Sequence, residues 1–198
     1  MTSIASLAAS ALGIRPTVKR SRLLMRAMAV VLGSSLLWAS AKVQVPFWPV
    51  PMTMQTYVVL SLGALLGWRL GALTVAFYLV EGALGLPVFA GTPANGIGLA
   101  YMAGTTGGYL AGYLVAVALV GMLAERGWDR SIPGIATALL AGEIAIIGFG
   151  CGWLAVQFGW ETALAVGFGP FLIGDVFKLL VAGATIIYGR RLRSTFAR

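Results

Sequence analysis

Long apolar blocks alternate with short polar or Gly- and Pro-rich segments along most of this chain. A helix needs roughly 20 apolar residues to cross a bilayer, and several of the blocks approach or exceed that length. This pattern predicts membrane-spanning helices. We expect six, at residues 23–41, 52–67, 70–86, 106–124, 132–158 and 163–188. The second block is short, so we expect it to be partly unwound at its proline-rich end.

The composition agrees with a single integral membrane domain. The 198 residues are 59% hydrophobic and only 10% charged, with a mean hydropathy of +0.91, whereas soluble domains are about 25% charged. The chain has no histidine and a single cysteine, Cys151. We therefore expect no His-based catalysis, no internal disulfide, no metal site and no cofactor.

The distribution of Lys and Arg predicts the orientation of the chain. Twelve of the fourteen lie near the termini or in the loops after the second and fourth blocks, which share one side of the membrane if there are six spans. Only Lys42 is expected on the other side, and Lys178 lies inside a span. The positive-inside rule then places both termini in the cytoplasm. We divide the chain into a basic tail (1–22), a transmembrane domain (23–188) and a second basic tail (189–198), and expect no nucleic-acid binding.

Glycines at four-residue spacing predict close helix packing. Gly104, Gly108 and Gly112 open the fourth predicted helix, and Gly148 and Gly152 lie in the fifth. Small residues at this spacing let helix backbones approach one another in lipid. A dedicated dimer face is the alternative interpretation, so the sequence leaves a homo-oligomer open.

Asp175 and Lys178 are the most informative polar residues, because they lie inside an apolar block. Charges in a span usually face a cavity, a ligand or each other, and a spacing of three puts these two on one helical face. A ligand site and a simple buried ion pair are both consistent with this pattern. Two more carboxylates lie in spans. Glu81 is close enough to the outer end to join a site. Glu143 is expected to be an interhelical hydrogen-bond partner, with a role in the site as the alternative.

Two loops on the predicted outer side carry further candidate residues. Prolines hold residues 43–55 extended, and such a backbone should cap a cavity or lie at the water interface. Residues 85–109 carry no charge and are too Gly-rich for a stable helix over their first two-thirds. The candidate ligand contacts in these loops are Phe47, Trp48, Thr53, Gln55, Phe89, Asn95 and Tyr101. The chain has no P-loop, so we expect no ATP hydrolysis by this chain.

Four segments together resemble one family. Val45-Pro-Phe-Trp-Pro-Val-Pro-Met-Thr-Met-Gln55, Gly85-Leu-Pro-Val-Phe-Ala-Gly91, Gly107-Gly-Tyr-Leu-Ala-Gly112 and Gly174-Asp-Val-Phe-Lys178 are similar to segments of the BioY biotin transporters. The resemblance covers roughly residues 23–188.

The resemblance implies an all-α, six-helix bundle that acts as the substrate-binding (S) component of an energy-coupling factor (ECF) transporter in the bacterial cytoplasmic membrane. Biotin would bind under the two outer loops, and the partners would be a transmembrane coupling protein and two ABC-type ATPases. The chain departs from the family at Thr105, where a proline is frequent. It also has Ala29 and Gly33 where S components often show Ala-xxx-Ala for docking the coupling protein.

The chemistry of the candidate residues agrees with such a ligand. Biotin presents ureido N–H groups that need acceptors, a carbonyl that needs a donor, and apolar rings that aromatic side chains can enclose. Asp175, Lys178 and Asn95 offer the polar partners. An S component for another vitamin and a membrane scaffold without transport activity are the competing interpretations.

Overall fold

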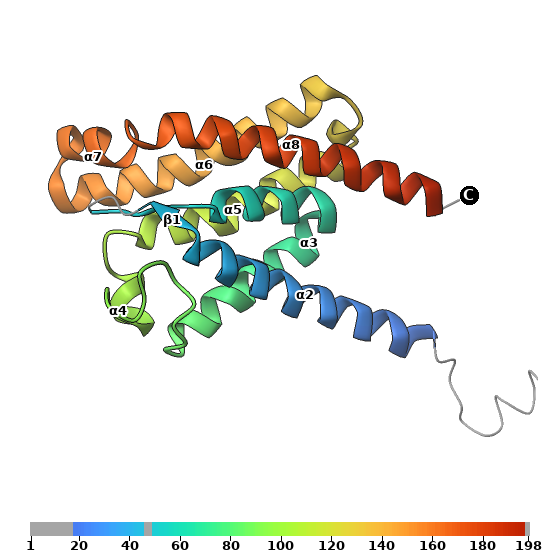
Figure 1. Ribbon diagram of the computed structural model, residues 1–198, viewed down its shortest axis with the longest axis horizontal. Coiled ribbons are helices and arrows are strands. Elements are labelled where there is room, and N and C mark those ends of the chain that lie inside the picture. The colour runs from blue at the N-terminus through green and yellow to red at the C-terminus, as the bar shows by residue number, and fades with distance from the viewer. Residues whose placement is uncertain (1–17, 46–48, 197–198) are drawn as a thin grey trace, which may run out of the picture.

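The computed structural model describes residues 18–45 and 49–196, and this part of the chain is a helical bundle with one short β-ribbon (Figure 1). The elements run in the order α2 (Val18–Lys42), β1 (Gln44–Val45), β2 (Met52–Thr53), α3 (Gln55–Ala83), α4 (Gly98–Met102), α5 (Gly107–Glu125), a 3-10 turn (Trp128–Arg130), α6 (Ile132–Phe158), α7 (Trp160–Gly167) and α8 (Phe171–Phe196).

Helix α3 is a hairpin rather than a rod. At Gly67 the backbone leaves the helical region, with φ 78° and ψ 170°, a conformation that suits glycine because it lacks a Cβ. In a straight helix Gln55 and Tyr78 would lie about 34 Å apart. Instead, the Gln55 Nε2 donates a hydrogen bond to the Tyr78 hydroxyl over 2.8 Å. The expected turn between the second and third predicted helices is therefore confirmed.

The start of the second predicted helix is wrong by three residues. Met52 and Thr53 pair with β1 in an antiparallel ribbon, with Gln44 opposite Thr53 and Val45 opposite Met52, so the helix begins only at Gln55. Met52 and Thr53 pair with β1 instead of joining the helix, in agreement with the partial unwinding expected at the proline-rich end.

The prediction of one helix over residues 163–188 is also wrong. Two helices, α7 and α8, are separated by residues 168–170, and Pro170 lacks the N–H that a continuous helix would need. The loop 85–109 contains the short helix α4, which its glycine content did not suggest. Helices α2 and α8 extend into the expected basic tails, at residues 18–22 and 189–196, and the division into tails and domain stays a prediction.

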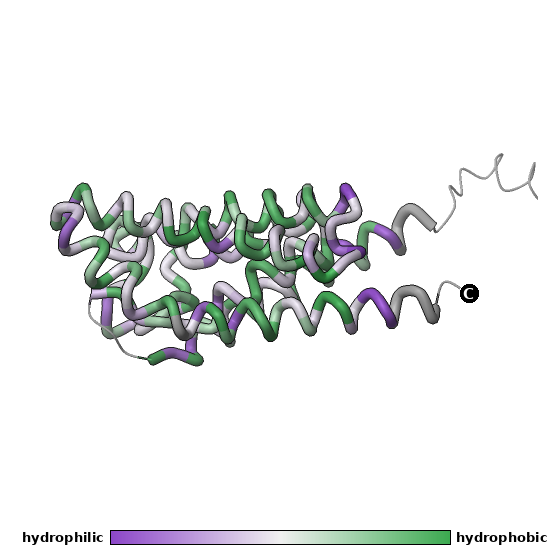
Figure 2. The backbone as a smooth tube through the Cα atoms, turned by 90° about the horizontal axis from the view of Figure 1, so that it is seen from above, coloured by the Kyte–Doolittle hydropathy of each residue, from purple (hydrophilic) through white to green (hydrophobic). Residues whose placement is uncertain are grey.

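The polarity of the bundle is that of a protein in lipid. By length and composition, four helical segments in the described part can cross a membrane: Arg22–Lys42, Gln55–Ala83, Gly107–Glu125 and Ile132–Phe158. Large apolar side chains point outward along the bundle, with Ile144 70% and Val156 82% exposed. The tube in Figure 2 is accordingly green or white over most of its helical length. An apolar surface of this extent suits contact with acyl chains rather than water.

The basic segments gather at one end of the bundle. In Figure 1 the start of α2, the turn of α3, the connection from α5 to α6 and the end of α8 lie toward the same end. Two contacts support this arrangement. Arg190 Nε lies 3.6 Å from Asp129 Oδ2, and the backbone N–H of Trp68 donates to Glu125 Oε1 over 3.1 Å.

The two glycine motifs play different roles. On α5, Gly112 lies against α6 so closely that an added Cβ would be 2.9 Å from Ile146 Cα, and Gly108 meets Phe149 and Trp153 of the same helix. Gly104 precedes α5. On α6, a Cβ at Gly148 or Gly152 would meet nothing within 4 Å in the described part of the chain. The first motif is confirmed as helix packing, and the second packs against no other part of the described bundle.

We therefore expect Gly112→Ala to lower the stability of the protein and Gly152→Ala to leave it unchanged or slightly raise it. Inserting a methyl group into a tight contact costs about 1–3 kcal/mol, whereas alanine in an open helical position gains about 1 kcal/mol over glycine. Thermal unfolding of the purified protein in detergent measures both. Equal melting temperatures for the two variants would contradict the described packing of α5 on α6.

Candidate ligand-binding site

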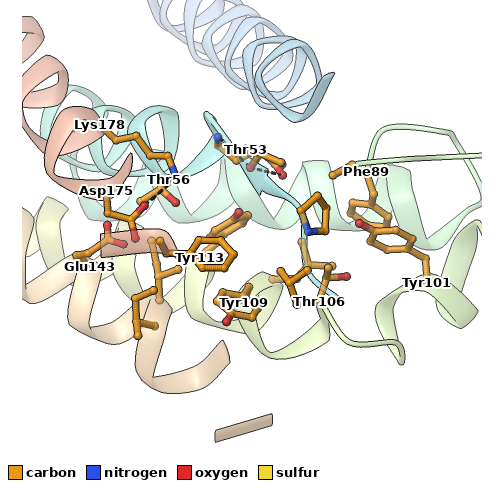
Figure 3. Close-up of a pocket in the computed structure, with 18 residues that line it drawn as sticks. Thr53, Thr56, Phe89, Tyr101, Thr106, Tyr109, Tyr113, Glu143, Asp175 and Lys178 are labelled. Carbon is orange, nitrogen blue, oxygen red and sulfur yellow. Dashed lines mark hydrogen bonds and ion pairs between the residues drawn. The ribbon is translucent and has the colours of Figure 1, made fainter. Parts of the chain in front are cut away.

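A narrow cavity lies inside the bundle, between the β-ribbon, the loop after α3 and helices α3, α5, α6 and α8 (Figure 3). The cavity volume is about 30 Å³, far below the range of about 300–1,000 Å³ typical of small-molecule sites. The cavity is thus a contracted site with a mixed aromatic and polar lining.

Asp175 and Lys178 form an ion pair on the cavity wall. Lys178 Nζ lies 2.7 Å from Asp175 Oδ1, and the residues are 3% and 6% exposed. Their three-residue spacing on α8 places both on the inner face of the helix, as predicted. Lys178 Nζ also lies 5.9 Å from the ring centroid of Phe171, at the outer range of a cation–π contact. Both charges are therefore withdrawn from lipid and held at the cavity.

Glu143 of α6 adds a second carboxylate to the same wall. Figure 3 shows it beside Asp175, on the side away from Lys178, and it is 8% exposed. Neither of its carboxyl oxygens has a hydrogen-bond partner of normal geometry among the described residues, but the carboxyl group of Asp175 on α8 lies close enough to interact with it. The expected interhelical partner is therefore present only as this contact between two carboxyl groups. The only sequence feature that pointed to a site role for Glu143 was the position of a carboxylate inside a membrane span.

A chain of hydrogen bonds joins the α3 hairpin to the loop that follows it. Gln55 Nε2 donates to the Tyr78 hydroxyl over 2.8 Å, and this hydroxyl donates to the carbonyl of Val88 over 3.0 Å. Thr53 Oγ1 accepts the backbone N–H of Gln55 over 3.3 Å. These bonds fix Gln55 and Thr53, the first residues after the proline-rich loop, against the cavity.

Aromatic rings form a further part of the lining. Phe89 and Tyr101 stack with centroids 4.9 Å apart and an interplanar angle of 15°, and Tyr109 stacks on Phe171 at 6.0 Å. Burial raises the pKa of the Tyr101 hydroxyl above its ordinary value, so this group remains neutral and can both donate and accept. Tyr109 and Tyr113 of α5 were not among the predicted contacts, although their spacing of four places them on one helical face.

Lys42 anchors the loop above the cavity. Its ammonium donates to the carbonyls of Pro87, at 2.8 Å, and Phe89, at 3.0 Å, and to the Thr92 hydroxyl at 3.1 Å. An ammonium group offers three donors, and all three are used here. This network explains why a cation occurs at the end opposite the other basic residues.

The structure brings most of the predicted contacts together. The predicted contacts that line the cavity are Thr53, Gln55, Phe89, Tyr101, Asp175 and Lys178. Phe47 and Trp48 lie outside the described residues. Asn95 is exposed and does not line the cavity, and neither does Glu81, which accepts a hydrogen bond from Ser34 of α2.

The predicted docking pair on α2 lies partly inside the fold. A Cβ at Gly33 would lie 2.5 Å from Thr74 Cγ2 and 3.4 Å from Leu62 Cδ2, so this residue packs against both halves of α3. Ala29 is half-buried. Gly33 is thus buried inside the fold, and a docking role for Ala29 and Gly33 stays a prediction.

Together, the lipid-facing exterior and the buried polar cavity define a multi-pass membrane protein with a site for a small ligand. Residues 9–195 match the model of the BioY family, and the chain belongs to this family. It is 35% identical to a "Probable biotin transporter BioY" of Pyrococcus horikoshii, over 83% of this chain and 93% of that protein. It is 34% identical to the "Biotin transporter BioY" of Thermotoga maritima, over 80% and 92% of the two chains.

A solved structure agrees with this assignment. The fold is similar to the crystal structure of the S-component for biotin from an ECF-type ABC transporter, with a TM-score of 0.74, 26% identity, and coverage of 88% of this chain and 93% of that one. The chain is therefore an all-α membrane transporter of the S-component fold and not an enzyme.

We expect Tyr78→Phe to destabilise the protein by about 1–3 kcal/mol, because the change leaves the buried amide of Gln55 and the carbonyl of Val88 without their partner. Thermal unfolding in detergent measures the effect. Tyr188, which is 65% exposed, provides the matched control Tyr188→Phe, for which we expect no change. A parental melting temperature for Tyr78→Phe would show that these bonds contribute no stability.

Proposed function

We propose that this chain binds biotin in the cavity at Asp175 and Lys178 and delivers it across the membrane as the S component of an ECF-type transporter. The observation that carries the proposal is the buried ion pair on the wall of an aromatic cavity, in a chain that belongs to the BioY family. The names of the two relatives and of the similar solved structure all refer to biotin.

The lining suits the chemistry of biotin. The ureido group carries two N–H donors and a carbonyl acceptor, which acidic and basic side chains at the cavity wall can meet. The stacked pair Phe89 and Tyr101 offers flat apolar surface for the thioether ring system. Gln55 and Thr53 add neutral polar groups close to the proline-rich loop. A few convergent polar groups in a largely apolar pocket are the usual pattern of a specific small-molecule site.

The narrowness of the cavity implies that the site opens when the ligand enters. The loop segments above it are held by side chains rather than by regular secondary structure. Thr105 Oγ1 donates to the carbonyl of Pro49 over 2.9 Å, and Lys42 holds residues 87–92. These side-chain hydrogen bonds can break and re-form while the helices stay intact. Movement of the loops then gives biotin a route to the ion pair of Asp175 and Lys178.

Transport then requires partners that supply energy. The chain has no P-loop, so ATP hydrolysis falls to other subunits. For an ECF transporter these are a transmembrane coupling protein and two ABC-type ATPases. The clustering of the basic segments at one end of the bundle supports a six-span arrangement with both termini in the cytoplasm, and the cavity then lies toward the outside.

We expect Asp175→Asn and Lys178→Met each to weaken biotin binding by about 10- to 150-fold. A hydrogen bond to a charged group contributes about 1.5–3 kcal/mol, and 1.4 kcal/mol corresponds to a factor of ten. Equilibrium binding of labelled biotin to the purified protein in detergent measures the affinity, with thiamine and riboflavin as competitors to test the alternative vitamins.

Each single variant leaves the other member of the pair as an unpaired buried charge, which destabilises the fold. Loss of binding in a single variant therefore does not distinguish a lost ligand contact from misfolding. The double variant Asp175→Asn/Lys178→Met removes both charges and separates the two effects. If the pair contacts biotin, the double variant is monodisperse and fails to bind. Parental affinity in a well-folded double variant would contradict the proposal.

We expect a cysteine at position 95 to react with an impermeant thiol reagent in intact cells. Asn95 is exposed in the loop at the end opposite the basic segments, and a Cys151→Ala background removes the natural thiol. Arg126→Cys, in an exposed position at the basic end, serves as the control and should react only after permeabilisation. The reverse labelling pattern would invert the topology.

A further inference from the structure

Glu143 is a buried, cavity-lining carboxyl group whose role the ion pair of Asp175 and Lys178 leaves unexplained. It is 8% exposed and lines the cavity, and both of its carboxyl oxygens lack a hydrogen-bond partner within the described residues. Buried polar groups in folded proteins almost always have such partners. A carboxyl group in this state inside a membrane bundle indicates that its partner is absent from the chain itself.

The neighbouring charges do not meet this need. Lys178 is engaged by Asp175, at 2.7 Å, and Glu143 lies on the other side of Asp175 (Figure 3). Asp175 has one oxygen occupied by the ammonium. Glu143 lies close enough to Asp175 for the two carboxyl groups to interact, but neither of its oxygens makes a hydrogen bond of normal geometry within the described residues. Of the two carboxylates at the cavity, Glu143 has the greater unused capacity to accept hydrogen bonds.

The opposite side of Glu143 offers no polar partner either. A groove between α6 and α8 reaches Glu143 and Asp175 from the exterior of the bundle. Apart from these two carboxylates, its described lining is apolar and includes Leu140, Phe168 and Val176. A hydrogen-bond partner must therefore come from the cavity.

We infer that Glu143 is a ligand-contacting residue that accepts a hydrogen bond from an N–H group of the substrate. The inference rests on the proposed function, in which the substrate is biotin and the N–H groups belong to its cyclic urea. Asp175 and Lys178 then hold one part of the polar head, and Glu143 selects for ligands that carry a donor beside it. A ligand without that donor would leave the carboxyl group unsatisfied, which is the strongest form of discrimination available to a small site.

The test compares Glu143→Gln and Glu143→Leu with the parent by calorimetric titration in detergent, using biotin and biotin methylated on one ureido nitrogen. We expect Glu143→Leu to weaken biotin binding by about 10- to 150-fold. Glu143→Gln should lose less, because its amide oxygen still accepts. The parent should bind biotin more tightly than the isomer whose methyl group blocks the nitrogen that Glu143 contacts. In Glu143→Leu this difference in affinity should be smaller. Both methylated isomers are tested, because either nitrogen could be the contacted one. Glu161→Gln, at an exposed carboxylate on α7, is the control and should bind biotin like the parent.

The outcomes separate this inference from the proposed function. If the parent does not bind biotin, both fail. If the parent binds and the monodisperse Glu143 variants keep its affinity and its preference for biotin over both isomers, this inference alone is overturned. A structural role would instead lower the melting temperature of the variants without changing the affinity. If Glu143→Leu does not fold, Glu143→Ala, which also removes the acceptor, decides by the same criteria.

Discussion

The burial of an Asp–Lys pair within an apolar bundle is the constraint on which the rest of this structure depends. Neither charge can face acyl chains at acceptable cost, so α8 must turn the face that carries Asp175 and Lys178 inward. Their attraction at 2.7 Å offsets part of the desolvation of both groups. The helices that pack around this face supply Thr56 and Glu143, and a polar centre forms inside a protein whose exterior is apolar.

The second constraint concerns irregular backbone at the site end of the bundle. Extended and looped segments inside a membrane protein persist only where protein or water satisfies their polar groups. Here long side chains meet this condition: Lys42 and Tyr78 bind carbonyls of the loop after α3, and Thr105 binds the proline-rich loop. The loop segments that cover the cavity are thus held by a few side-chain hydrogen bonds, and they can move without disrupting the helices.

The helical frame itself depends on close backbone contacts. Gly112 brings α5 onto α6, and Gly63 brings α3 onto α5, where an added Cβ would lie 2.7 Å from the Val117 carbonyl oxygen. In lipid, where no hydrophobic driving force brings helices together, such contacts provide much of the packing energy. Tightly packed helices below loops that a few side-chain hydrogen bonds hold in place are suited to binding and releasing a small molecule.

The sequence by itself determined the membrane class, most of the helices, the hairpin turn near Gly67 and the shared helical face of Asp175 and Lys178, because these follow from local hydropathy, charge and spacing. It also indicated six of the side chains that line the cavity. Only the tertiary structure decided that Glu143, Tyr109 and Tyr113 face this cavity while Glu81 and Asn95 do not, and that α7 and α8 are separate helices. The reason is physical: a residue's helical face follows from its spacing, but the neighbour that this face meets depends on how distant helices pack together.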